Sequence, residues 1–555
     1  MKSRRRSPDL KKRKKRIGRR VERELRREDP AYTPSESAIQ EAEVVRVARM
    51  IDRSSLVQQL EGILVPNPQL GGRARTLPIR TYLIVAILNA TGNRVLTGPQ
   101  MLEVATRDLP GYIQCELGIR DERGRILVTL RMFRYLLSAL ERQLGTRNVS
   151  NPVAKTSREQ LHFDLIQSFV AASIPRGIQW ATTQSLDATA LRTFGRARKD
   201  LDKRADKDAH WGACTRMGQY KSESKTQIFF GYDLHLTAAT RAVGGSIADQ
   251  PELITGMQLV PAATDVVDAT MPLIRHQREV MGDSFDEIIV DRAYSYKLPE
   301  RWLDELSKLG IAQVADLHPL DQGARDYEGM QIIAGCAHCP FTPEHLASIP
   351  RPSPTKKKPQ VSLEEKIAFE TEIEQRQRYS LRLVANGETS ERRQCPALAG
   401  KVRCTTRPET IDTGDDLPLV EGPSDMETAP KVCQQSSVTI PHSALGKMRQ
   451  PLYWGSTAWL RSFDRRTVVE RKNGDLKQPI TNNLQHGTWQ VMGKIKNSIM
   501  AALCVIANNL RIARQWAARH DKTHLDSDLL SPDPDYTPNM TAPPNYRGLP
   551  PPTAA

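Results

Sequence analysis

The chain has 555 residues, of which 39% are hydrophobic and 26% charged, and its formal net charge is +16. This length exceeds what one compact core holds, so we expect two or three domains with flexible ends. No apolar run approaches the roughly 20 residues that span a bilayer, which excludes a helical membrane protein. The first residues also lack the apolar stretch of a secretory signal, so we expect a protein that stays in the cytoplasm.

Positive charge is concentrated at the N-terminus. Between Met1 and Glu28 there are 15 Lys or Arg residues and 4 Asp or Glu residues. We predict that residues 1–40 form a disordered basic tail, because like charges repel each other and few apolar side chains are available for burial. Such blocks attract nucleic acid without sequence specificity, and a merely solubilising tail is the alternative.

Residues 41–175 are predicted to form a helical N-terminal domain. Apolar residues recur at helical spacing in 44–64, 78–91 and 132–144, and again in 163–170. Gly, Pro and Asn residues interrupt this pattern and separate short helices. A helical domain in this position could bind DNA or mediate dimerisation, and the sequence alone does not choose between them.

Strand-like runs begin in residues 176–318. They cover 180–186, 228–237, 285–290 and 312–317, with helix-like runs at 263–280 and 299–309. Early strands followed by alternating helices and strands predict an α/β fold, with a mixed sheet and flanking helices. This order is compatible with the first part of a ribonuclease-H-like core.

Residues 319–452 break the pattern, and we interpret them as an insertion into the core. They contain Pro-rich pieces and an isolated charged helix predicted near 363–378. The regular pattern resumes in residues 453–520, the second part of the core, which ends in a long helix predicted over 492–518. Residues 521–555 are rich in proline, so we predict a second disordered tail.

Two aspartates stand at the ends of predicted strands. Asp187 follows the run Thr183–Leu186, and Asp291 follows the buried run Phe285–Val290. Sites in open α/β sheets gather at the carboxyl ends of strands, and cleavage of phosphodiesters by two metal ions needs carboxylates from separate segments. The alternative in each case is a capping role, for Asp187 in a turn and for Asp291 at the helix after Pro299.

Glu470 is the third candidate carboxylate. Arg466, Glu470 and Lys477 stand at positions i, i+4 and i+11 of a helix predicted over 465–477, which places them on about one face. An acid between two bases on one face suits a metal ligand beside phosphate contacts. An ordinary Arg–Glu salt bridge is the alternative, and Gly474 weakens the helix prediction.

The Glu470 motif resembles that of DDE-superfamily transposases of bacterial insertion sequences, in the group with a Tyr-x2-Arg-x3-Glu-x6-Lys signature. Arg466, Glu470 and Lys477 fit this spacing, whereas Phe463 stands where the group has Tyr. This departure removes one hydroxyl contact and leaves the predicted metal ligands intact.

The resemblance extends to the two aspartates and covers roughly residues 178–514. Asp187 begins an Asp-Ala-Thr segment, and Asp291 begins Asp-Arg-Ala-Tyr, which matches the family's Asp-x-(Gly or Ala)-Tyr. Two further pieces match, Phe230-Gly231-Tyr232 in an early strand and Ala507-Asn508-Asn509-Leu510-Arg511 in the closing helix. Three motifs in the family's order are more specific than any one of them.

The resemblance implies a transposase that cleaves DNA at the ends of an insertion sequence and joins the ends to target DNA. Asp187, Asp291 and Glu470 would be catalytic and would hold two Mg²⁺ or Mn²⁺ ions. Four basic residues near Glu470 would contact DNA: Arg465, Arg466, Arg471 and Lys477.

The implied partners are double-stranded DNA at the transposon ends and target DNA. Because two ends must be cut together, the family implies a homo-oligomer on DNA, associated with the bacterial nucleoid and not with a membrane. A metal-dependent nuclease on the same fold, or a catalytically idle DNA-binding descendant of a transposase, is the alternative. A structural or RNA-binding protein that uses only the basic tail is a further alternative, but it would not explain the carboxylates at strand ends.

The eight cysteines are unevenly spaced and do not describe a disulfide framework. Cys336 and Cys339 have the CxxC spacing with which two thiolates grip one zinc ion, and Cys395, Cys404 or Cys433 could complete the site. A second close pair is missing, so reduced cysteines are favoured over a structural zinc ion at Cys336, Cys339, Cys395 and Cys404.

Two tryptophans, Trp454 and Trp459, lie just before the predicted Glu470 helix. A flipped base could stack on either of them in a DNA complex. Burial in the core is the more frequent role of such aromatic residues, and we favour it here.

Overall fold

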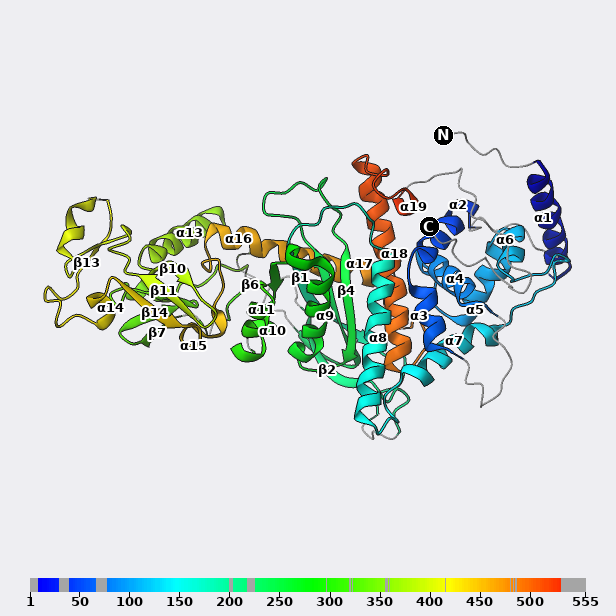
Figure 1. The fold of residues 1–555 in the computed structure, drawn as a ribbon, viewed down its shortest axis with the longest axis horizontal. Coiled ribbons are helices and arrows are strands. Elements are labelled where there is room, and N and C mark those ends of the chain that lie inside the picture. Colours follow the sequence, from blue (N-terminus) through cyan, green and yellow to red (C-terminus); the bar gives the residue numbers. More distant parts are fainter. Residues whose placement is uncertain are drawn as a thin grey trace.

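The computed structural model describes residues 8–28, 39–65, 77–198, 203–216, 225–295, 297–318, 321, 323–354, 358, 360–414, 416–479, 481–482, 484 and 487–530. These residues form three parts along one long axis: N-terminal helices, a central mixed sheet, and a group of small sheets at the far end (Figure 1). Within the described ranges, no helix is long and apolar enough to cross a membrane.

The described residues of the first part are mainly helical. Its helices are α1 (Pro8–Glu28), α2 (Glu41–Asp52), α3 (Leu56–Ile63), α4 (Ile79–Thr91), α5 (Gly98–Glu103), α6 (Gly111–Glu116), α7 (Leu130–Leu144) and α8 (Pro152–Ala172). Helix α4 is buried along nearly its whole length, because apolar residues cover all its faces, and it forms the centre of this part.

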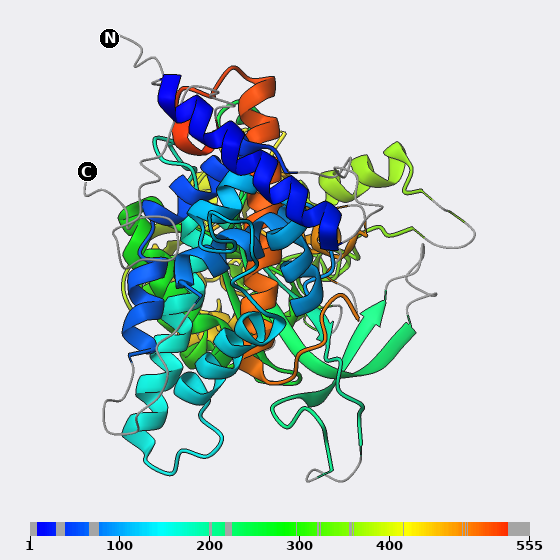
Figure 2. The same cartoon turned by 90° about the vertical axis from the view of Figure 1, so that its right-hand side faces the viewer.

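The prediction of a disordered basic tail was wrong for residues 8–28, which form helix α1. Ile17, Val21 and Leu25 recur every four residues on one face of α1 and are buried, with Tyr112 packed against them. This apolar stripe docks α1 on the other helices, and Figure 2 shows it lying across them. Residues 1–7 and 29–38 of the predicted tail lie outside the described residues.

The central sheet has strands of mixed direction. They are β1 (Thr183–Arg192), β2 (His210–Arg216), β3 (Lys225–Ala239), β4 (Ile254–Pro261), β5 (Glu287–Val290) and β6 (Ala312–Ala315). The order is β2-β3-β1-β5-β6, and β4 pairs with the second half of the long strand β3. Strand β3 runs antiparallel to β1, β2 and β4, whereas β1, β5 and β6 are parallel.

Helices cover both faces of this sheet. Helix α9 (Val266–Met281) packs on the face that carries Leu186, Ile288 and Val290. The opposite face packs against α8, α17 (Thr467–Lys477) and α18 (Lys494–Arg519). Helix α18 is the predicted closing helix, and in Figure 1 it stands beside α8 between the sheet and the N-terminal helices.

Two of the segments that match the family, 230–232 and 507–511, each contain a residue with a local structural role. Gly231 of β3 pairs with Arg192 of β1, and a Cβ atom at Gly231 would collide with the carbonyl oxygen of Leu191, so only glycine fits. Asn509 of α18 bonds both backbone groups of Ile254, at 3.0 Å and 2.8 Å, and thereby ties α18 to β4.

Residues 319–452 form small sheets separate from the central one. The elements are β7 (Ala324–Tyr327), β8 (Met330–Ile333), β9 (Cys336–His338), α12 (Glu344–Ala347), α13 (Leu363–Arg378), β10 (Arg382–Asn386), β11 (Ser390–Gln394), β12 (Arg403–Cys404), β13 (Leu419–Val420), α14 (Lys431–Gln434), β14 (Ser437–Pro441) and α15 (His442–Leu445). Helix α13 confirms the predicted charged helix, and a capping box between Ser362 and Glu365 sets its start.

The chain then returns to the sheet through α16 (Thr457–Phe463) and α17, and it continues past α18 to α19 (Ser527–Leu530). The prediction of a disordered tail from residue 521 was wrong for the described part, because Leu529 and Leu530 are buried and Asp526 accepts hydrogen bonds from Arg53. Residues 531–555 lie outside the described residues.

Candidate active site

The prediction that Asp187 stands at a strand end was wrong. Asp187 lies in the middle of β1. Strand β1 continues to Arg192 because β3 pairs with it over this whole stretch. Successive side chains of a strand point to opposite faces, so Leu186 enters the core on the α9 side while Asp187 faces α17. Asn473 of α17 donates a hydrogen bond from Nδ2 to Asp187 Oδ2 at 2.9 Å.

Asp291 comes directly after β5, as predicted. Strands β1 and β5 are parallel, and Ser185 pairs with Ile289, so Asp187 and Asp291 are level two residues further on. Asp291 lies beyond the last paired residue of β5, and its closeness to Asp187 is seen in the pKa of Asp187, which the charge of Asp291 raises. Asp291 Oδ1 accepts the backbone N–H of Ala293 at 2.8 Å, which holds its orientation.

Glu470 lies on α17, which packs across β1 and β3. It precedes Asn473 by three residues, so the two side chains share a face of the helix. The carboxylate of Glu470 forms an ion pair with Arg466 at 2.6 Å, and its side chain is 45% exposed. The Arg–Glu salt bridge that the sequence offered as the alternative is therefore present.

The three carboxylates share one electrostatic environment. Burial raises the pKa of Asp187 to about 6, and the nearby charge of Asp291 adds to this rise. Burial also raises the pKa of Asp291, while Arg466 lowers it and Glu470 raises it. Like charges gathered in this way disfavour ionisation and favour a bound cation.

The donor atoms suit the predicted Mg²⁺ or Mn²⁺ ions, because carboxylate oxygens are the hard ligands that these ions prefer. Among the described residues, however, no three His, Cys, Asp or Glu side chains form a group placed to hold a metal ion. Two predicted ligands, Asp187 and Asp291, lie level, and the third, Glu470, is paired with an arginine.

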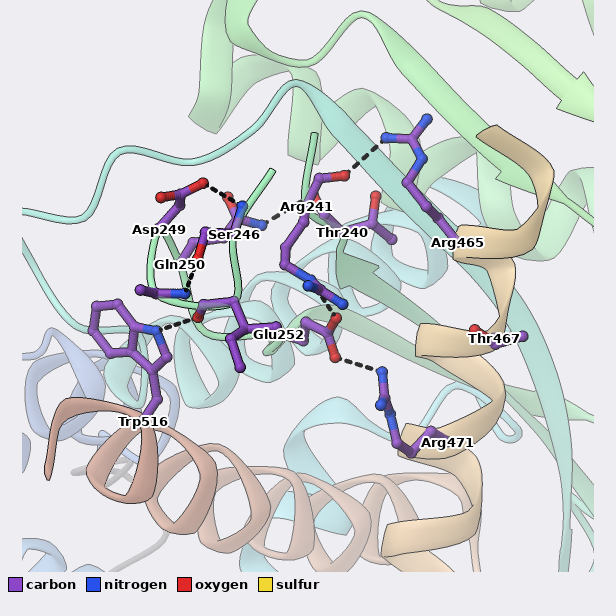
Figure 3. A network of polar contacts seen from close by, with 12 residues as sticks. Thr240, Arg241, Ser246, Asp249, Gln250, Glu252, Arg465, Thr467, Arg471 and Trp516 are labelled. Atoms are coloured by element: carbon purple, nitrogen blue, oxygen red, sulfur yellow. Dashed lines mark hydrogen bonds and ion pairs between the residues drawn. The ribbon is translucent and has the colours of Figure 1, made fainter. Parts of the chain in front are cut away.

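Arg465, a predicted DNA contact, is turned into the protein. Its guanidinium donates to the carbonyl of Arg241 at 2.9 Å (Figure 3). It also donates to Thr183 Oγ1 at 3.0 Å and forms an ion pair with Glu287. The side chain is only 14% exposed. Arg465 therefore anchors the start of α17 to the sheet and has no free face for DNA in this arrangement.

The other predicted DNA contacts lie nearer the surface. Arg471 is 54% exposed and pairs with Glu252 at 2.5 Å, and Glu252 also accepts from Arg241 (Figure 3). Arg466 lies over the ring of Phe463 at 5.5 Å while it pairs with Glu470. Lys477 ends α17 and is half-buried.

The aromatic residues before α17 belong to the core, which confirms the favoured interpretation. Trp454 and Trp459 are buried, and their indole N–H groups donate to Asp316 and Gln450. Phe463, which stands where the family has Tyr, stacks on Trp459 with ring centres 4.7 Å apart.

The two cysteines of the CxxC pair in the insertion lie in different environments. The thiol of Cys336 accepts a hydrogen bond from Arg393 at 3.4 Å. Cys339 instead belongs to an apolar cluster that contains Cys404 and contacts Cys395. Burial raises the pKa of the Cys339 thiol, with smaller contributions from Cys433, Cys395 and Cys404.

All eight cysteines are free in the structure. The charges of Cys395, Cys404 and Cys433 act on Cys339, whereas Cys336 lies beside Arg393. The CxxC spacing alone could not separate these possibilities, because Cys433 comes from a segment almost a hundred residues away.

Asn473 is the site residue that the sequence prediction missed. Its position three residues after Glu470 on a predicted helix was the available signal. The resulting site contains two level carboxylates, an amide that orients one of them, and an Arg–Glu pair, which together can bind cations and approach phosphates.

The chain matches no protein-family model, and no significant match connects it to a curated protein or to a solved structure. A function can therefore be inferred only from this chain's own residues and their geometry.

Proposed function

We propose that the protein is a DDE transposase, which cleaves DNA at the ends of an insertion sequence and transfers the freed strands to target DNA. The level placement of Asp187 and Asp291, beneath the helix that bears Glu470, carries this proposal. The central sheet supports it, because antiparallel strands come first and parallel strands joined by helices follow, as expected of a ribonuclease-H-like core.

Asp187, Asp291 and Glu470 would hold the divalent ions of this reaction. Bound Mg²⁺ or Mn²⁺ would supply Lewis-acid activation of the attacking water or 3′-hydroxyl and stabilisation of the leaving oxygen. Asn473 holds the carboxylate of Asp187 in place through its bond to Oδ2. The raised pKa values of the two aspartates are consistent with residues that gain a cation in the working complex.

Arg466 would exchange partners when DNA binds. Its guanidinium now pairs with Glu470, and a DNA phosphate would offer it two acceptor oxygens. Release of Glu470 would then leave its carboxylate available to a cation. Lys477 and Arg471 lie on the same helix and would contact neighbouring phosphates, whereas we assign Arg465 an anchoring role.

Double-stranded DNA at the element's ends and target DNA are the proposed partners, and a homo-oligomer on DNA is proposed because two ends must be processed together. The proposed location is the bacterial nucleoid. None of these steps uses the cysteines of the insertion.

The test is cleavage of labelled duplexes that carry the ends of the element flanking the gene, in Mg²⁺ or Mn²⁺, with wild-type protein and Glu470→Gln. Glutamine keeps the size of the side chain and removes its charge. Glu372→Gln is the matched control, because Glu372 is an exposed glutamate on α13. We expect the wild type and the control to cut and join, and Glu470→Gln to bind DNA but do neither.

Other outcomes contradict the proposal in different ways. Cleavage without joining assigns the protein to the nucleases. Binding without cleavage by the wild type identifies an idle DNA-binding descendant. Equal cleavage by Glu470→Gln removes Glu470 from the site.

A further inference from the structure

A second charged region lies away from the three carboxylates. A cavity of ≈ 920 Å³ opens where the turn after α7 meets the first residues of α8 and α18. In Figure 1 these two helices run side by side, and both begin at the lower edge of the view. Both helices are long, with 21 and 26 residues, so the positive ends of two helix dipoles lie at this cavity.

The lining of this cavity is strongly basic. It includes seven Lys or Arg side chains, among them Arg147, Lys155, Lys494 and Lys496, against three acidic ones. The backbone N–H of Lys494 at the start of α18 donates to a carboxylate oxygen of Asp208 at 3.0 Å. The helix end thus already holds one anionic group, which shows the kind of ligand that this environment stabilises.

A buried histidine points to a ligand beyond the protein's own groups. His162 of α8 lines the cavity and is 6% exposed, and its Nε2 atom has no hydrogen-bond partner. Burial lowers the pKa of His162 to about 3, and the charge of Lys494 adds to this effect. The imidazole of His162 is therefore neutral. Buried polar atoms are nearly always hydrogen-bonded, so the Nε2 atom indicates a missing ligand.

A second cavity of ≈ 780 Å³ adjoins the first and shares Ala205 and Met492 with it. Its lining contains Arg192, Arg196, Arg198 and Lys203, and none of the described residues that line it is acidic. We call the two cavities together, from Arg147 and Lys155 to Arg196 and Arg198, the basic trough.

The size of the basic trough favours a polyanion over a single small anion. A free phosphate is satisfied by two or three cationic groups, whereas eleven Lys or Arg side chains line these adjoining cavities. Repeated phosphates along a nucleic-acid backbone match such a row of charges. The mixture of exposed Arg and Lys side chains also suits contacts that carry no base specificity.

Strand β1 connects the basic trough to the carboxylates. Arg192 lines the trough at the end of β1, five residues or roughly 17 Å beyond Asp187 at about 3.3 Å per residue, and its side chain leaves the opposite face of the strand.

We propose that the basic trough binds the sugar-phosphate backbone of the element's end duplex outside the cleavage site, an inference that rests on the proposed transposase function. The trough would set the register of the DNA, so that the scissile phosphate reaches Asp187 and Asp291. The N-terminal helices would in this way act together with the sheet to hold one duplex.

Two double variants test this inference, Arg147→Ala with Lys155→Ala and Arg196→Ala with Arg198→Ala. All four side chains are exposed, so the fold should survive, and thermal unfolding checks this. The control is Lys366→Ala with Arg382→Ala, two exposed basic residues of the insertion. The measurements are equilibrium binding of the end duplex in Ca²⁺ at several salt concentrations, and hydroxyl-radical footprints.

We expect each trough variant to lower the slope of log affinity against log salt by about 1.8, since each lost phosphate contact contributes about 0.9. Part of the backbone protection outside the cleavage position should disappear, while protection at the cleavage position remains. The control should retain both the wild-type slope and the wild-type footprint.

Cleavage by the same wild-type preparation distinguishes failure of the trough inference from failure of the proposed function. If the wild type cuts the ends and the trough variants keep its slope and footprint, the trough inference is wrong and the proposed function stands. If the wild type neither binds nor cuts the duplex, both fail. Displacement of the duplex by millimolar inorganic phosphate would assign the trough to a small anion and overturn the inference.

Discussion

Asp187 of β1 and Asp291, the residue directly after β5, lie close enough for the charge of one to act on the other, and the parallel pairing of their strands ends two residues before them, at Ser185 and Ile289. The two carboxyl groups therefore repel each other in the absence of a cation, and this repulsion adds to the rise that burial causes in the pKa of Asp187. A bound cation would offset this repulsion.

The first prediction concerns Asp291→Asn. In EDTA this variant should be more stable than the wild type, by on the order of 1 kcal/mol, because one of two neighbouring charges is gone. Added Mg²⁺ should stabilise the wild type and not the variant. Thermal unfolding with and without Mg²⁺ measures both effects, and a variant that gains as much as the wild type from Mg²⁺ would contradict the assignment of Asp291 as a ligand.

The second prediction is a pH dependence. Because the folded-state pKa of Asp187 is about 6, against an ordinary value of 3.8, the folded protein holds this proton more tightly than the unfolded chain. The stabilising contribution of this proton is full below about pH 3.8 and is lost as the pH rises through 6.

Asp187→Asn cannot ionise and should lack this dependence. In EDTA, the stability of the variant relative to the wild type should therefore increase between pH 4 and pH 7, by on the order of 1 kcal/mol. Urea unfolding of both proteins across this range measures the difference. A constant difference would mean that Asp187 has an ordinary pKa in the folded protein.

Some of this site could be predicted from sequence because its signals are local. The spacing of Arg466, Glu470 and Lys477 predicts one helix, and α17 carries Glu470 and Lys477, while Arg466 lies in the turn just before it. The run before Asp291 is short, apolar and followed by a polar residue, which is typical of a buried strand end, and β5 ends there.

Other features depend on partners distant in sequence. Strand β1 continues through Asp187 because β3 pairs with it as far as Arg192. No local sequence pattern predicts this pairing. Strands β2 and β4 contain Gly212 and Gly256 and were not predicted, since pairing with the long β3 outweighs weak strand propensity.

The N-terminal helix shows a different source of error. Charge density predicted disorder, but Ile17, Val21 and Leu25 need only one face of α1 to dock it. A count of charges does not detect such an apolar stripe, whereas the helical spacing of the few apolar residues predicts it.

The third prediction concerns Asn473 as a positioning residue. Asn473→Ala removes the bond to Asp187 Oδ2, so the carboxylate should be less well ordered for a cation. We expect cleavage to need a roughly 10-fold higher Mg²⁺ concentration for half-maximal rate, while the rate at saturating Mg²⁺ changes little. Mg²⁺ titrations of the cleavage rate measure this.

Gln375→Ala is the control for this experiment, because Gln375 is an exposed amide on α13. It should leave the Mg²⁺ dependence unchanged. If Asn473→Ala instead lowers the rate equally at all Mg²⁺ concentrations, Asn473 does not act through the cation site.

The fourth prediction separates two adjacent arginines. Arg465 is largely buried and bonds Glu287, Thr183 and the Arg241 carbonyl, so Arg465→Gln leaves buried acceptors without a charged partner. We expect a loss of about 2 kcal/mol or more in the free energy of unfolding, and an unchanged salt slope of DNA binding.

Arg466→Gln should behave in the opposite way. Its ion pair with the 45% exposed Glu470 contributes little to stability, so urea unfolding should change by less than about 1 kcal/mol. If Arg466 takes a phosphate in the DNA complex, the slope of log affinity against log salt should fall by about 0.9. Because the two residues are neighbours of identical chemistry, a reversed pattern would place Arg465 on the DNA and Arg466 in the fold, and the orientation of α17 proposed for the bound state would be wrong.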